Sequence, residues 1–155
     1  MDMKIFKNKI IQSIGLVLLV IVIWNIFRFY PQSTITLQNV QQQPQIIINF
    51  TSLKDFGTRG FFEVNSRLFC NSDDHSHLTA WNFIPTGQEY IGFIEKMPAQ
   101  FDSQQQRYIY HISLDLDEQQ RQEIQNKKLQ CRVMTGHYLR GFIRSNVIEF
   151  TLNRE

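Results

Sequence analysis

An apolar segment near the N-terminus constrains this chain more than any other feature. From Ile10 to Phe27 the sequence holds no charged residue and consists mainly of Ile, Leu and Val. A helix rises ~1.5 Å per residue and needs about 20 mainly apolar residues to cross ~30 Å of hydrocarbon. Inside a bilayer a helix also satisfies its own backbone amides and carbonyls. The sequence therefore predicts a transmembrane helix over residues 10–30.

Residues at the end of this segment are typical of a membrane–water interface. Trp24 and Tyr30 are amphipathic aromatic residues of the kind that collect there, and Arg28 can reach outward from the same level. Three lysines lie within residues 1–9, whereas residues 31–53 carry no charge. The positive-inside rule therefore favours a cytoplasmic N-terminus and places residues 31–155 beyond the membrane.

Two alternatives to a membrane anchor exist. A cleaved signal peptide also has a basic start and an apolar core, but it needs small residues at its cleavage site, and residues 24–31 are bulky. A buried helix of a soluble domain would have a polar face, which residues 10–30 lack. We therefore expect an uncleaved signal-anchor in a bacterial inner membrane, with the C-terminal domain in the periplasm.

Composition limits the size and character of the chain beyond the anchor. The remaining residues, about 125, suffice for one domain. The formal net charge of +2 gives no reason to expect a nucleic-acid partner. The expected organisation is a cytoplasmic N-terminus over residues 1–9, the anchor over 10–30, a stalk with a candidate strand over 31–44, and an extracytoplasmic domain over 45–155.

Short alternating segments predict that this domain is mainly β, a small antiparallel β-sandwich. Residues 61–70 and 129–135 alternate apolar and polar side chains, the period-two pattern of half-buried strands. Residues 139–144 and 147–152 are expected to form a hairpin about Ser145 and Asn146. One short surface helix is expected over residues 115–128, with Asp115 or Asp117 at its cap.

The chain has two cysteines, Cys70 and Cys131, both in the part expected outside the cytoplasm. An oxidising compartment favours a disulfide between them; two buried free thiols are the alternative. The order Cys70, Trp81, Cys131 resembles immunoglobulin-type sandwiches, in which a tryptophan packs on a bridge between the sheets. The resemblance implies a core position for Trp81. Leu129 stands where those domains carry a tyrosine, so the resemblance is incomplete.

One loop contains the best metal-ligating candidates. Its side chains are of types that bind zinc or copper, namely Asp73, Asp74, His75 and His77. A polar loop of this composition is more often simply solvated, so we expect neither a metal nor another cofactor. No Gly-x-Ser-x-Gly elbow, Cys-x-x-Cys pair or phosphate-binding glycine loop occurs, and no catalytic residue is assigned. We therefore expect a protein that is not an enzyme.

These features favour a single-pass, membrane-anchored binding module, an accessory or assembly subunit of a bacterial envelope complex. Its expected partners are the lipid bilayer and another membrane or envelope protein. One alternative is a membrane-anchored immunity protein or inhibitor that neutralises a toxin or hydrolase. Another is a metal-handling or redox accessory protein centred on His75 and His77. The sequence does not specify an oligomeric state.

Overall fold

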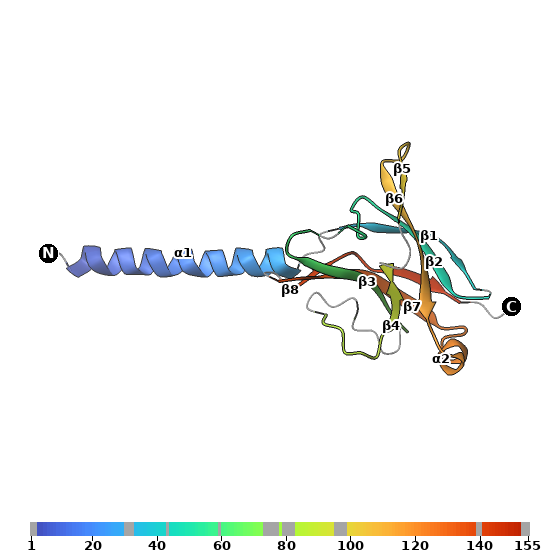
Figure 1. Cartoon of the computed structure of the whole chain (residues 1–155). Coiled ribbons are helices and arrows are strands. Elements are labelled where there is room, and N and C mark those ends of the chain that lie inside the picture. The colour runs from blue at the N-terminus through green and yellow to red at the C-terminus, as the bar shows by residue number, and fades with distance from the viewer. Residues whose placement is uncertain are drawn as a thin grey trace.

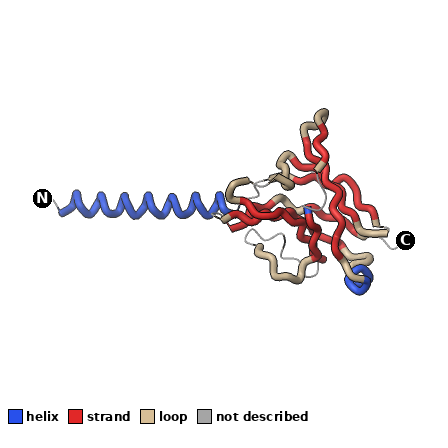
Figure 2. Tube along the Cα trace, viewed as in Figure 1, coloured by secondary structure: helices blue, strands red, loops and turns tan. Residues whose placement is uncertain are grey.

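A long helix and a curled β-sheet make up the chain (Figure 1). The computed structural model describes residues 3–29, 33–42, 44–58, 60–72, 78, 83–94, 99–138 and 141–152, and within the helix it describes the side chains of residues 12–26. The helix projects from the sheet as a rod, and its C-terminal end lies beside the sheet (Figure 2).

Helix α1 spans Met3–Phe29 as one continuous element. Its large apolar side chains from Ile14 to Ile26 are each 49–64% exposed. The amide of Asn25 donates to the carbonyl oxygen of Ile21 at 2.8 Å, so this polar group is satisfied within the helix. Of the residues that the structure describes, none forms a helix both long and apolar enough to cross a bilayer.

Within the described residues, nine strands and a second helix come after α1. In chain order they are β1 (Ile35–Gln41), β2 (Ile47–Ser52), β3 (Glu63–Ser72), β4 (Tyr90–Phe93), β5 (Gln100–Asp102), β6 (Arg107–Asp115), α2 (Glu118–Glu123), β7 (Lys128–His137), β8 (Gly141–Arg144) and β9 (Ile148–Thr151). The strands form one sheet in the order β1-β2-β6-β4-β3-β7-β8, with β5 also on β6 and β9 also on β7. All pairings between these strands are antiparallel, so the expectation of a mainly β, antiparallel domain is confirmed.

The sheet curls around one apolar core. Alternate residues of the strands point inward and are fully buried, among them Ile48, Phe50, Leu68, Tyr110 and Val133. The ring of Tyr110 stacks on Phe50 with 5.1 Å between ring centroids, and its hydroxyl oxygen accepts from the backbone N–H of Phe56 at 2.6 Å. Burying an aromatic ring while bonding its hydroxyl is what allows a tyrosine into such a core.

Cys70 and Cys131 form a disulfide in this core, and neither residue is exposed. They are direct partners on the neighbouring strands β3 and β7, with 4.1 Å between their Cα atoms. An immunoglobulin-type bridge would instead join two facing sheets. The disulfide agrees with the sequence prediction, but the immunoglobulin-like arrangement does not, because the bridge links adjacent strands of one sheet.

The C-terminal strands also differ from expectation. β8 and β9 do not pair with each other as a hairpin about Ser145 and Asn146. Both pair with β7, one after the other, and the register shifts by one residue between them. The hydroxyl of Ser145 accepts from the backbone N–H of Val133 at 2.9 Å, so this N–H of β7 has a hydrogen-bond partner at the register shift. The chain therefore bends at this point without leaving the edge of β7.

Two predicted boundaries are refined by the structure. β1 lies inside the 31–44 segment expected as a stalk with a candidate strand, and Ile35 at its start is 1% exposed, so this segment is part of the folded domain. The predicted 115–128 helix is shorter, since α2 covers only Glu118–Glu123. Its cap is Asp117, which forms a capping box with Gln120, and Ile124 after it is fully buried.

Candidate binding groove

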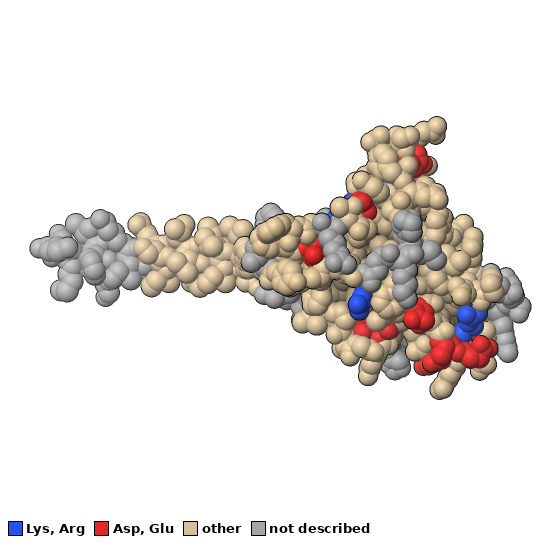
Figure 3. All heavy atoms as spheres, viewed as in Figure 1, with Lys and Arg blue, Asp and Glu red and all other residues tan. Residues whose placement is uncertain are grey.

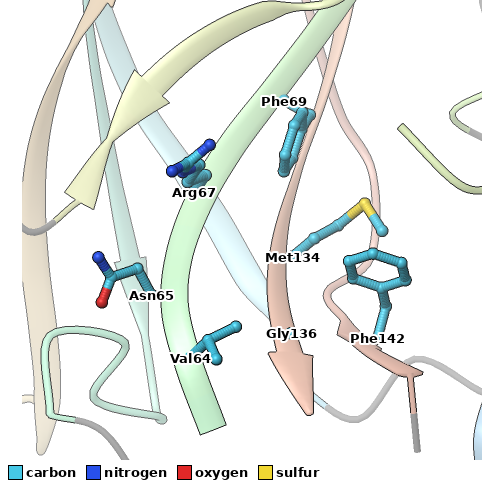
Figure 4. A pocket seen from close by; sticks show the side chains of 7 residues that line it. All are labelled: Val64, Asn65, Arg67, Phe69, Met134, Gly136 and Phe142. Atoms are coloured by element: carbon cyan, nitrogen blue, oxygen red, sulfur yellow. The ribbon is translucent and has the colours of Figure 1, made fainter. Parts of the chain in front are cut away.

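A groove lies on the outer face of the sheet, on the side opposite the main core. Its volume is about 360 Å³. β3, β7 and β8 supply its lining (Figure 4), which consists of Val64, Asn65, Arg67, Phe69, Met134, Gly136 and Phe142. Most of these side chains are apolar, and the polar ones stand on β3.

Local irregularity in β3 creates the space. Between Glu63 and Ser66 the pairing of β3 with β7 shifts register, so the strict alternation of the strand is broken there. Val64 consequently lies over Gly136 and remains 40% exposed, although alternation places it on the inward face with Leu68 and Cys70. A Cβ atom on Gly136 would come within 2.2 Å of a γ-carbon of Val64. Only glycine allows this close approach.

Arg67 supplies the positive charge of the groove. Its guanidinium lies over the ring of Phe93, 5.1 Å from the ring centroid, which is a cation–π arrangement. The side chain is half-buried, so the cation is held in place while it still faces solvent. A guanidinium fixed in this way can bind a carboxylate with two parallel hydrogen bonds.

A second apolar cluster forms the floor of the groove. Phe69 and Met134 belong to it and are 8% and 2% exposed. Leu78 and Phe83, from the segment between β3 and β4, cover part of the same face. β7, which lies between β3 and β8 in the sheet, is therefore buried on both faces along most of its length, and the groove lies beside Phe69 and Met134 on its outer face.

Two buried arginines tie the covering segment to the sheet. Arg132 donates to the carbonyl oxygens of Leu78 at 2.6 Å and Ser145 at 2.8 Å. Arg144 donates to the carbonyl oxygen of Phe83 at 2.8 Å. Burial, together with the positive charge of Arg144, lowers the pKa of Arg132 to about 10. Arg132 therefore remains charged at neutral pH, and both arginines donate to backbone carbonyl oxygens outside the strand ladders.

Phe142 forms one wall of the groove and is held by Arg144. The guanidinium of Arg144 lies 5.7 Å from the ring centroid of Phe142 and donates to its carbonyl oxygen at 3.0 Å. Because Arg144 holds this ring in place, the Phe142 side chain loses little conformational entropy when a ligand packs on it. The groove as a whole suits an apolar side chain followed by an acidic group that reaches Arg67.

The residues singled out from the sequence have different positions. Trp24 lies on α1 and is 53% exposed. The metal candidates Asp73, Asp74, His75 and His77 lie outside the described residues, as do Trp81, Tyr30 and the side chain of Arg28. Within the part of the chain that the structure describes, no three His, Cys, Asp or Glu side chains are grouped to hold a metal ion.

His111 belongs to a short polar row on the outer face of β1, β2 and β6. Its Nδ1 contacts the side-chain oxygen of Asn49, whose amide donates to Asn39. These three residues are direct register partners across the strands. The row is a cross-strand hydrogen-bonded ladder, which accounts for the imidazole without a catalytic role.

Sequence patterns alone do not reveal the groove. Alternation assigns Arg67 and Asn65 only to the polar face of a strand, and Met134 to the face opposite Cys131. The single available signal is Gly136, a glycine at the end of an otherwise regular strand, since such a glycine often marks a close approach of another chain segment. Comparisons with family models, with curated proteins and with solved structures give no match to this chain.

Proposed function

We propose that this protein is a single-pass, membrane-anchored binding module that serves as an accessory or assembly subunit of a bacterial envelope complex. Residues 10–30 act as the anchor, and the β domain presents the groove on β3, β7 and β8 to a partner protein. Lipid and that partner are the two ligands of the protein.

The observation that carries the proposal is the exposure of α1. Its large apolar side chains from Ile14 to Ile26 are all about half exposed, around the whole circumference of the helix. The space-filling view shows no charged atoms along the described part of this rod, whereas both signs of charge occur on the domain (Figure 3). A helix that is apolar all round is stable only where lipid or protein covers it.

Two further features support an extracytoplasmic domain. The lysines within residues 1–9 favour retention of the N-terminus in the cytoplasm. The Cys70–Cys131 disulfide suits an oxidising compartment such as the periplasm. We therefore propose a bacterial inner-membrane location with the β domain in the periplasm.

The chemistry of the groove supports a protein partner of a particular kind. Its apolar floor is flanked by one ordered guanidinium, that of Arg67. This chemistry matches a partner segment that inserts an apolar side chain and places a carboxylate beside it. The partner is a protein of the same membrane or envelope, because α1 keeps the groove close to the bilayer.

Affinity purification from membranes tests this proposal. The tagged full chain is extracted in mild detergent, and co-purifying proteins are identified by mass spectrometry. The Asn65→Trp variant fills the groove, whereas Gln104→Trp adds the same side chain to the exposed turn between β5 and β6. We expect one envelope protein to be retained by the wild type and by Gln104→Trp but lost with Asn65→Trp.

Two outcomes contradict the proposal. The first is that no envelope protein is enriched over an unrelated single-pass protein carrying the same tag. The second is that the enriched protein is bound equally by the Asn65→Trp and Gln104→Trp variants, which would show that the groove does not contact it. Retention of the folded state in both variants is checked by their unfolding midpoints.

A further inference from the structure

Three exposed aromatic residues gather at one end of the β domain. Phe61 is 93% exposed, Tyr138 is 78% exposed and Phe62 is 42% exposed. We name this cluster the aromatic tip. Single exposed apolar residues are common. A group of large aromatic side chains in water is unfavourable in free energy, and such a group typically marks a surface that a partner or a membrane covers.

The aromatic tip is an ordered structure. The rings of Phe61 and Phe62 meet edge to face with 4.8 Å between centroids. The backbone N–H of Tyr138 donates to the carbonyl oxygen of Phe62 at 3.0 Å, which joins the end of β7 to the turn before β3. The ring of Phe62 also lies 6.0 Å from that of His137. Two segments far apart in the sequence therefore hold the three aromatic residues together.

The aromatic tip lies at the end of the domain that meets α1. Strand β8, which begins shortly after Tyr138, contacts α1. In Figure 1 the turn that leads into β3 and the start of β8 both lie beside the C-terminal end of the helix. The β5–β6 hairpin, which carries the exposed Phe101, points away from it.

We infer that the aromatic tip inserts into the membrane–water interface beside the anchor, so that the β domain rests on the bilayer at a second point. This inference rests on the proposed membrane anchoring of α1. Aromatic rings with one polar edge are favoured at the level of lipid headgroups, and Tyr138 has such an edge in its hydroxyl. The occupant of this surface is therefore the lipid headgroup region.

Contact at two points has a consequence for the groove. Val64 and Gly136, at one end of the groove, stand only two residues from Phe62 and Tyr138 in sequence. With the tip in the interface, this end of the groove lies near the lipid surface and the end at Phe69 lies farther out. A partner segment in the groove then approaches along the membrane surface.

Site-specific photo-crosslinking in intact membranes tests the inference. The photoreactive analogue p-benzoylphenylalanine is placed at Phe61, at Trp24 or at Phe101 of the full chain. It replaces one aromatic ring by another, and each site is at least half exposed, so the fold is preserved. Lipid adducts of the protein are then measured by mass spectrometry after irradiation.

We expect lipid adducts with the probe at Trp24 and at Phe61, and none above background at Phe101. Adducts at Trp24 without adducts at Phe61 would overturn the aromatic tip as a membrane contact and leave the anchor intact. An adduct of Phe61 to a protein instead of lipid would overturn it as well. Absence of lipid adducts at Trp24 would refute the anchor itself, and the inference with it.

Discussion

Asn146 acts as a strand partner for Ile35, a residue 111 positions earlier in the chain. Its side-chain oxygen accepts from the backbone N–H of Ile35 at 2.7 Å, and its side-chain amide donates to the carbonyl oxygen of Ile35 at 3.0 Å. The backbone N–H of Asn146 also donates to the carbonyl oxygen of Ser33 at 3.2 Å. One side chain thus joins the first strand to the segment between β8 and β9.

Replacing this side chain should open the junction. Asn146→Ala leaves both backbone groups of Ile35 without their partner, so we expect a loss of about 2 kcal/mol in the free energy of unfolding. Asn146→Asp keeps the acceptor and should lose less. Urea unfolding of the full chain in mild detergent measures both, with Ser103→Ala in an exposed turn as the control. Equal stability of Asn146→Ala and the control would contradict this role.

The disulfide should contribute more than any single hydrogen bond. Cys70 and Cys131 are separated by 61 positions, and closing a loop of that size stabilises the folded chain by about 4 kcal/mol in the chain-entropy model. Reduction should therefore lower the free energy of unfolding by about that amount. The same unfolding experiment with and without reductant measures it. Two alkylatable thiols in unreduced protein from membranes would refute the bridge.

Gly136 should be irreplaceable only while Val64 is present. Gly136→Ala places a Cβ 2.2 Å from a γ-carbon of Val64, an overlap that should cost about 1–3 kcal/mol. Val64 is 40% exposed, so Val64→Ala alone should be mild and should relieve most of that cost in the double variant. A double-mutant cycle on unfolding free energies measures this coupling. Simple additivity of the two changes would show that the overlap is relieved in another way.

Glu89 should make folding sensitive to acid. Burial acts to raise its pKa, but hydrogen bonds from the backbone and hydroxyl of Thr86 and from Gly87 N–H outweigh burial and lower it. A depressed pKa stabilises the fold above the unfolded-state value of ~4.3, and this contribution is lost as pH falls through the folded-state value. The stability gap between wild type and Glu89→Gln should therefore shrink below pH ~4.3. A gap independent of pH would contradict this assignment.

Much of the local structure can be predicted from side-chain alternation and cap chemistry. As alternation in residues 129–135 predicts, Leu129, Cys131 and Val133 lie in the main core, and Met134 lies in the second apolar cluster on the other face. Asp117 caps α2 as predicted. Arg132 misleads the same reasoning, because a charged residue in an alternating strand indicates a solvated face. It is 3% exposed, and the carbonyl oxygens of Leu78 and Ser145 accept its hydrogen bonds.

Strand neighbours and the groove could not be predicted in this way. Alternation specifies which face of a strand a residue occupies, but not which strand lies beside it. The pairing of Cys70 with Cys131 across adjacent strands, and not between two sheets, is a property of strand order. The groove depends on the register shift near Val64, where one displaced residue moves a side chain off its expected face.

The orientation of the domain relative to the membrane tests the central claim most directly. Two reporters, fused separately after Glu155, report the compartment of the C-terminus. Alkaline phosphatase is active only outside the cytoplasm, and green fluorescent protein fused in this way fluoresces only in the cytoplasm. The account requires that the phosphatase fusion is active and that the green fluorescent protein fusion does not fluoresce. Both fusions must stay in the membrane fraction after alkaline carbonate extraction. A fluorescent fusion with inactive phosphatase, or release of the protein by carbonate, would contradict it.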